Sequence, residues 1–278
     1  DLSYYKPPDD SPEIKYLKKC RKELGGPLPS RRISGDKLII PGLSIFDRLL
    51  NETGDREISS TQALVQAITI LCRDKNIGQR VVPIVPDEAR TFGMEGMFRQ
   101  IGIYAHEGQK YEPVDREQLM YYKENQSGQM LQEGITEDGA MSSWIAAATS
   151  FSNSGMQMIP FYMFYSMFGF QRIGDLIWAA GDMQARGFLI GATSGRTTLN
   201  GEGLQHEDGH SQIMAGNVPN CISYDPTFSY ELLVIMHDAM TRMFKKQENV
   251  FYYITTMNEN YSHPGLTRGQ EKNIIKGM

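Results

Sequence analysis

The sequence predicts an α/β fold in which a mostly parallel sheet is covered by helices on both faces. Short continuous apolar runs of strand length, such as 81–85 and 188–192, indicate strands buried on both faces. Segments with apolar residues at helical spacing alternate with these runs, most regularly after residue 136. Such alternation is typical of parallel strands joined by crossover helices. The length of 278 residues fits one large domain or two small ones.

Composition narrows the classes of protein. Charged residues make up 22% of the chain and the net charge is −5, which disfavours a general binder of nucleic acid or membrane surfaces. No apolar run approaches the ~20 residues that a membrane-spanning helix needs. Cys20, Cys72 and Cys221 are odd in number and widely spaced, so we expect reduced, buried thiols. A cytoplasmic protein without nucleic-acid or membrane partners is expected.

The first 36 residues differ from the remainder. They are polar, are broken by five prolines, and indicate an extended arm or linker with one short helix around Pro12–Leu24. We expect residues 37–278 to form the α/β domain. Because the chain begins at Asp1 with neither Met nor a signal peptide, we interpret it as an excised piece of a longer protein.

The first part of the domain contains a predicted helix and a predicted buried strand. Ser59 and Ser60 cap a helix that extends to Arg73, and the strand at 81–85 follows it. Asp87 and Glu88 come directly after this strand, where open α/β sheets bind ligands. A structural network of these acids with the nearby arginine is an equal alternative. Residues 91–132 indicate surface excursions and short helices.

A helix predicted from about Thr136 to Thr149 is the central element. Its apolar residues recur at helical spacing, and Glu137 lies in its first turn, where the helix dipole favours an anion. A glutamate that merely begins a helix is the alternative interpretation.

Further elements follow in alternation. Strands are expected at 158–164, 188–192, 220–224 and 250–255, and the second and third of these should be buried. Helices are expected at 173–186 and 228–244. The apolar stripe of the first of these helices would comprise Ile177, Ala180 and Met183. Asp225 and Pro226 would cap and begin the second.

Residues 201–210 contain two histidines in a glycine-rich segment. The string from His206 to His210 matches the HExxH pattern of zinc proteases. That pattern needs a regular helix, and each internal glycine costs ~1 kcal/mol relative to alanine in a helix. We therefore expect a loop that places His206 and His210 near Glu202, where they can transfer protons near neutral pH.

Three aromatic residues, Tyr162, Tyr165 and Phe168, are spaced by three positions where a strand gives way to a loop. They form either an aromatic core cluster or a surface on which a flat ligand ring stacks.

Taken together, these motifs resemble a known family. The order G-I-x-E-x-x-A at 134–140, the aromatic triplet and G-E-G-x-x-H at 201–206 resemble the pyrimidine-binding domain of transketolase-like thiamine diphosphate enzymes. Residues 87–96 and 162–175 are more similar still to the middle domain of homodimeric bacterial pyruvate dehydrogenases. The resemblance extends from about Leu38 to the end of the chain.

The resemblance implies roles for individual residues. Glu137 would hydrogen-bond the aminopyrimidine ring nitrogen of thiamine diphosphate and promote loss of the thiazolium proton. Tyr162, Tyr165 and Phe168 would line the pyrimidine pocket, and Ile135 would be the wedge that supports the bent cofactor.

The resemblance also implies an active-site histidine, His206, paired with Glu202 near the substrate. His210, Asp87 and Glu88 would lie behind the site or at a dimer interface. The family's diphosphate and metal signature, GDG followed by an asparagine pair, is missing, since Asp36 and Asp182 each follow a single glycine. We therefore expect no metal ligand here, Mg²⁺ bound by another part of the parent protein, and a fragment that is inactive alone.

In the whole protein, the resemblance implies decarboxylation of pyruvate and reductive acetylation of a lipoyl group. Implied partners are a second copy of the full-length chain and the dihydrolipoyl acetyltransferase component with its lipoyl domain. One alternative is a transketolase-type ketol transferase, which needs basic phosphate ligands, and only Arg196 lies near the histidine segment. Another is a non-catalytic dimerisation or assembly scaffold, against which Glu137 and His206 argue.

Overall fold

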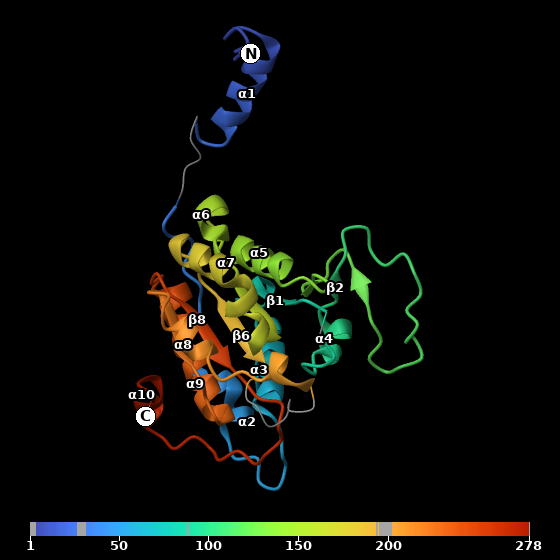
Figure 1. Cartoon of the computed structure of the whole chain (residues 1–278), viewed down its shortest axis with the longest axis vertical. Coiled ribbons are helices and arrows are strands. Elements are labelled where there is room, and N and C mark those ends of the chain that lie inside the picture. The colour runs from blue at the N-terminus through green and yellow to red at the C-terminus, as the bar shows by residue number, and fades with distance from the viewer. Residues whose placement is uncertain (1–3, 27–31, 88, 193, 195–201, 278) are drawn as a thin grey trace.

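A six-stranded parallel sheet forms the centre of the computed structural model, which describes residues 4–26, 32–87, 89–192, 194 and 202–277 (Figure 1). All of its strand pairs are parallel, which confirms the predicted sheet. In spatial order its strands are β4 (Leu131–Gln132), β1 (Val81–Val85), β5 (Ile159–Tyr165), β6 (Phe188–Ala192), β8 (Phe251–Thr255) and β7 (Cys221–Tyr224). A second sheet pairs β2 (Ile103–Tyr104) with β3 (Glu124–Asn125).

Helices cover both faces of the six-stranded sheet, as predicted. The described α-helices are α1 (Pro12–Glu23), α2 (Asp47–Leu50), α3 (Ser60–Cys72), α4 (Glu95–Gln100), α5 (Glu137–Ala148), α6 (Ser150–Ser154), α7 (Phe170–Asp182), α8 (Ser211–Ala215), α9 (Ser229–Met240) and α10 (Glu271–Ile275). One apolar cluster joins the sheet to α3 and α9, and the other joins it to α5 and α7. None of these helices is long and apolar enough to cross a membrane.

The central helix α5 forms where it was predicted. Thr136 is its N-cap, and the Thr136 hydroxyl accepts a hydrogen bond from the Gly139 N–H at 3.2 Å. Trp144 is fully buried, and its indole N–H donates to the main-chain carbonyl of Phe188 at 3.0 Å. This bond fixes α5 against β6, so the position of Glu137 at the start of α5 is set by the core of the sheet.

The helix after β5 differs from the prediction. It begins at Phe170, three residues before the predicted start, and Ile173 has non-helical backbone angles that mark a kink. Ile177 and Ala180 are buried as expected, but Met183 is the C-cap and is 54% exposed. The predicted stripe was therefore wrong at Met183, because the helix ends one residue before it.

Two predictions around β7 were also wrong. This strand lies at the edge of the sheet and is only half-buried, because no strand covers its outer side. The helix α9 is capped at Phe228 rather than at Asp225: the Glu231 carboxylate accepts the N–H groups of Thr227 and Phe228 at 2.9 and 2.8 Å. Asp225 instead accepts a hydrogen bond from the Thr255 hydroxyl at 2.5 Å.

The three cysteines are free, and they are half-buried rather than fully buried. Burial raises the pKa of the Cys72 and Cys221 thiols to about 12, so both remain protonated near neutral pH.

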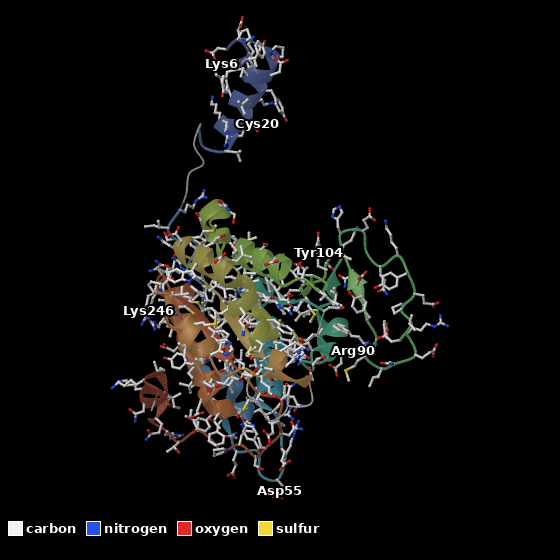
Figure 2. All side chains as sticks on the ribbon, in the orientation of Figure 1. Lys6, Cys20, Asp55, Arg90, Tyr104 and Lys246 are labelled. Atoms are coloured by element: carbon white, nitrogen blue, oxygen red, sulfur yellow. The ribbon has the colours of Figure 1, made fainter. Side chains whose placement is uncertain are left out.

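The N-terminal segment carries the predicted short helix, α1, which has no buried residue. Figures 1 and 2 show it apart from the sheet, with Lys6 and Cys20 at this end of the molecule. Arg32 already bonds the domain, since its N–H donates to the Ser152 carbonyl at 3.1 Å, and the Ile33 carbonyl accepts a hydrogen bond from the buried Arg186 at 3.0 Å. Division of the chain at residue 36 stays a prediction.

Candidate active site

One pocket of about 240 Å³ gathers most of the residues that the sequence singled out. It lies at the carboxyl ends of β1 and β5, beside the start of α5, which is where open α/β sheets bind ligands. Its lining comprises Pro86, Asp87, Ile135, Glu137, Phe164, Tyr165, Phe168, Arg172 and His206.

Two acidic residues line this pocket: Asp87 is exposed, whereas the side chain of Glu137 is only 14% exposed. Its Oε1 lies 3.0 Å from Nη1 of Arg172, which donates to it. The Arg172 guanidinium in turn lies over the Phe168 ring, 3.8 Å from the ring centroid. Arg172 was not predicted from the sequence. Its position four residues after Phe168 is the one local feature that indicated a contact between the two side chains.

The aromatic triplet divides into two parts. Tyr165 and Phe168 line the pocket and meet edge to face, with ring centroids 5.8 Å apart. Tyr162 is fully buried and lies outside the lining, where Phe164 is found instead. The Tyr162 hydroxyl is 3.4 Å from the main-chain carbonyl of Glu137. Burial, followed by the charge of Glu137, raises the pKa of Tyr162, so its hydroxyl remains a donor.

His206 also lines the pocket, where it packs against the aromatic residues. Its ring lies 5.3 Å from the ring of Tyr165 and 5.0 Å from that of Phe168. Nε2 lies 3.3 Å from the carboxylate of Glu202, which does not line the pocket. Nδ1 is buried and has no hydrogen-bond partner among the described residues. Among the described residues, His206 is therefore held at one ring nitrogen, through Glu202.

The remaining predicted residues surround the site. Ile135 is 83% exposed and lies at the rim. Asp87 lines the pocket and accepts a hydrogen bond from Gln132 Nε2 at 2.8 Å. Arg90 pairs with Asp115.

Glu88, Arg196 and most of the segment 193–200 lie outside the described residues.

The HExxH string is not on one helix. A 3₁₀ turn ends at His206, α8 begins at Ser211, and the residues between them are not helical. Within the part of the chain that the structure describes, no group of three or more His, Cys, Asp or Glu residues is placed to hold a metal ion.

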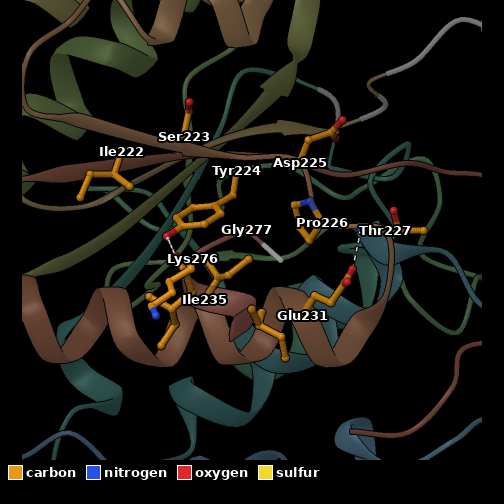
Figure 3. Close-up of a pocket in the computed structure, with 12 residues that line it drawn as sticks. Ile222, Ser223, Tyr224, Asp225, Pro226, Thr227, Glu231, Ile235, Lys276 and Gly277 are labelled. Atoms are coloured by element: carbon orange, nitrogen blue, oxygen red, sulfur yellow. Dashed lines mark hydrogen bonds between the residues drawn. The ribbon is translucent and has the colours of Figure 1, made fainter. Parts of the chain in front are cut away.

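A larger pocket, of about 510 Å³, lies elsewhere and contains none of the predicted site residues. It is bounded by β7, α9 and the residues after α10 (Figure 3). The Tyr224 hydroxyl donates across it to the Ile275 carbonyl at 2.6 Å. That bond ties the C-terminal helix to the edge of the sheet, a structural role.

Comparison with known proteins identifies the relatives of this chain. The family described as "Pyruvate dehydrogenase E1 component middle domain" matches residues 44–264. Curated proteins named pyruvate dehydrogenase E1 component are 61% identical in Cupriavidus necator and Escherichia coli, and 60% identical in Pseudomonas aeruginosa, over the whole chain. The chain spans 31% of the length of these relatives.

Solved structures are similar in fold. A transketolase from Leishmania mexicana has a TM-score of 0.59 at 11% identity, and the matched region covers 81% of this chain and 28% of the transketolase chain. A transketolase from Campylobacter jejuni has a TM-score of 0.57 at 12% identity, and the matched region covers 80% of this chain and 29% of the transketolase chain. At these identities the similarity shows that the fold is transketolase-like.

Proposed function

The chain belongs to the family of pyruvate dehydrogenase E1 component middle domains, and we propose that its pocket binds the aminopyrimidine part of thiamine diphosphate. In the whole protein, the reaction would be decarboxylation of pyruvate with transfer of the two-carbon unit to a lipoyl group. The whole protein would act as a cytoplasmic homodimer with the dihydrolipoyl acetyltransferase component, and Mg²⁺ would be held mainly outside this chain. The observation that carries the proposal is a recessed carboxylate, Glu137, in an aromatic pocket that His206 also lines.

The residues present fit such a ring. Tyr165 and Phe168 offer aromatic surfaces for a flat heterocycle, and Ile135 stands at the rim as the proposed wedge. His206 Nδ1 is a buried polar atom without a partner among the described residues. Thiamine diphosphate, when bound, supplies carbanion stabilisation, and the protein supplies orientation and electrostatics.

Glu137 would hold or move a proton at its Oε atoms, against a ring nitrogen in the pocket. Arg172 fixes the orientation of the Glu137 side chain through its bond to Oε1. Tyr162 supports the first turn of α5 from below through the Glu137 carbonyl. His206, oriented by Glu202, would serve the substrate with Nδ1.

The test is Glu137→Gln in the full-length enzyme. The amide keeps the shape of the side chain but cannot accept and release a proton as a carboxyl group does. Positioned proton transfer accelerates a reaction by roughly 10²–10⁴-fold. We expect exchange of the thiazolium proton to slow within that range while much of the cofactor affinity remains. Asp138→Asn is the matched control, because Asp138 lies in the same turn and faces solvent. Exchange within about threefold of wild type in Glu137→Gln, well short of that range, would exclude this role.

A further inference from the structure

The segment that carries His206 ends in a buried hydrogen-bond network centred on Asp208. The side chain of Asp208 is 4% exposed. Its Oδ1 accepts the main-chain N–H groups of His210 and Ser211 at 3.1 and 3.0 Å, and its Oδ2 accepts the Ser211 hydroxyl. The Ser211 hydroxyl accepts in turn from Tyr253, at 2.9 Å. Tyr253 is fully buried in β8, so the network connects the segment to the interior of the sheet.

The charges in this network give it a direction. Burial alone would raise the pKa of Asp208, but hydrogen bonds from the Ser211 side chain, the Ser211 backbone and the His210 backbone lower it overall. Burial raises the pKa of Tyr253, which stays neutral. Tyr253 therefore donates to Ser211, and Ser211 donates to a charged carboxylate, and bonds to charged acceptors are the stronger kind.

The fold leaves room for this connection. Gly191 on β6 lies against the Tyr253 hydroxyl, and a Cβ added there would collide with it. A second attachment lies close by, where Nε2 of His210 meets Nε2 of Gln171 on α7 at 2.7 Å.

His206 itself has few polar restraints. Its Nε2 meets Glu202, whose side chain is half exposed, and its Nδ1 has no partner among the described residues. The polar bonds of this segment are concentrated two residues further along the chain, at Asp208.

We propose that Asp208, acting through Ser211 and Tyr253, is the positioning residue for His206. It fixes where His206 Nδ1 lies in the pocket and does not itself touch the substrate. The consequence for catalysis rests on the proposed function, whereas the consequence for the position of the ring does not. A misplacement of about 1 Å can cost on the order of 10²-fold in rate.

The test uses Tyr253→Phe, which removes one hydroxyl, and Asp208→Asn, which removes the charge. The matched control is Tyr252→Phe, because Tyr252 lies on the same strand in the opposite apolar cluster and its hydroxyl binds Arg242 instead. In NMR spectra of this 278-residue chain, contacts of the His206 ring with Tyr165 and Phe168 should weaken or shift in both variants. They should stay unchanged in the control. Unchanged contacts in Tyr253→Phe and Asp208→Asn would overturn the proposal, whatever the activity.

The full-length enzyme supplies the second measurement. Acetyl transfer to a lipoyl domain should fall about 10²-fold in Tyr253→Phe and Asp208→Asn. Thiazolium proton exchange, which we assign to Glu137, should stay within about twofold of the wild-type rate. General destabilisation would instead lower proton exchange and acetyl transfer equally. If the ring contacts shift but transfer is unaffected, the positioning is correct and the proposed role of His206 fails. If His206→Ala reduces transfer while both network variants retain it and leave the ring contacts unchanged, the positioning fails and the proposed function stands.

Discussion

The position of Glu137 can be explained either by the stability of helix α5 or by binding of a ligand. A glutamate in the first helical turn is favoured by the helix dipole alone, so its position in α5 needs no functional explanation. Its surroundings do need a functional explanation. The carboxylate is recessed in an aromatic pocket, and it is bound by Arg172, which lies on a helix that begins 33 residues later. A solvated helix-start glutamate has neither feature. The pocket therefore favours the functional interpretation over the structural one.

The next prediction concerns His206. Replacing His206 with Ala in the full-length enzyme should spare thiazolium proton exchange and decarboxylation, because the ring contacts Tyr165 and Phe168 whereas Glu137 is held by Arg172. Transfer to the lipoyl group should fall further, since the departing sulfur needs a proton and general acid catalysis contributes roughly 10²–10⁴-fold. The two half-reactions are measured separately, with an artificial electron acceptor and with a lipoyl domain.

The control for this experiment is His106→Ala, because His106 is exposed and does not line the pocket. Equal losses in both half-reactions of His206→Ala would assign His206 a general binding role instead.

The N-cap of α5 gives a prediction about stability. Thr136→Ala removes the side-chain oxygen that accepts the Gly139 N–H, and losing an N-cap costs about 1 kcal/mol of unfolding free energy. Thr136→Ser retains the hydroxyl and should remain within a few tenths of a kcal/mol of wild type. Urea unfolding of the three proteins measures this difference. Equal losses in both variants would show that the methyl group, not the cap, is what matters.

The attachment of residues 32–36 to the domain gives another prediction. The buried Arg186 donates to the carbonyls of Ile33 and Gln247 at 3.0 and 3.1 Å, and it lies over the Phe151 ring. Arg186→Met removes both bonds, and a hydrogen bond that involves a charged group is worth roughly 1.5–3 kcal/mol.

Arg32→Met is the control for this attachment, because the Arg32 side chain bonds the Asn153 carbonyl at the exposed surface. Limited proteolysis should cut the N-terminal segment faster in Arg186→Met only. If both variants resist cleavage as the wild type does, the attachment does not depend on Arg186.

Local patterns determined which elements could be predicted. The strands at 81–85 and 188–192 match to the residue, because both faces of a central strand are buried and the apolar run is continuous. The start of α7 was missed by three residues, since the 3₁₀ turn at 166–168 and the kink at Ile173 leave no periodic signal. Arg172 was missed because its partner, Glu137, lies 35 residues away, and single-sequence patterns report neighbours within a few residues.

We propose that this chain forms only part of the cofactor site of the whole protein. The family match identifies a middle domain, and the chain spans 31% of the length of its curated relatives. The described pocket offers aromatic rings, one recessed carboxylate and one histidine, which suit a heterocycle. Its single cation, Arg172, is already paired with Glu137, so it offers little to a diphosphate.

The last prediction follows from this division. Thiamine diphosphate with Mg²⁺ should bind this 278-residue chain weakly, because only the pyrimidine contacts are available to offset the loss of ligand freedom. We expect a dissociation constant well above micromolar, which corresponds to less than about 8 kcal/mol of binding free energy. Calorimetric titration measures it, with the full-length enzyme as the control that binds tightly. Sub-micromolar binding to this chain alone would show that the diphosphate site lies within it, and the proposed division of the site would be wrong.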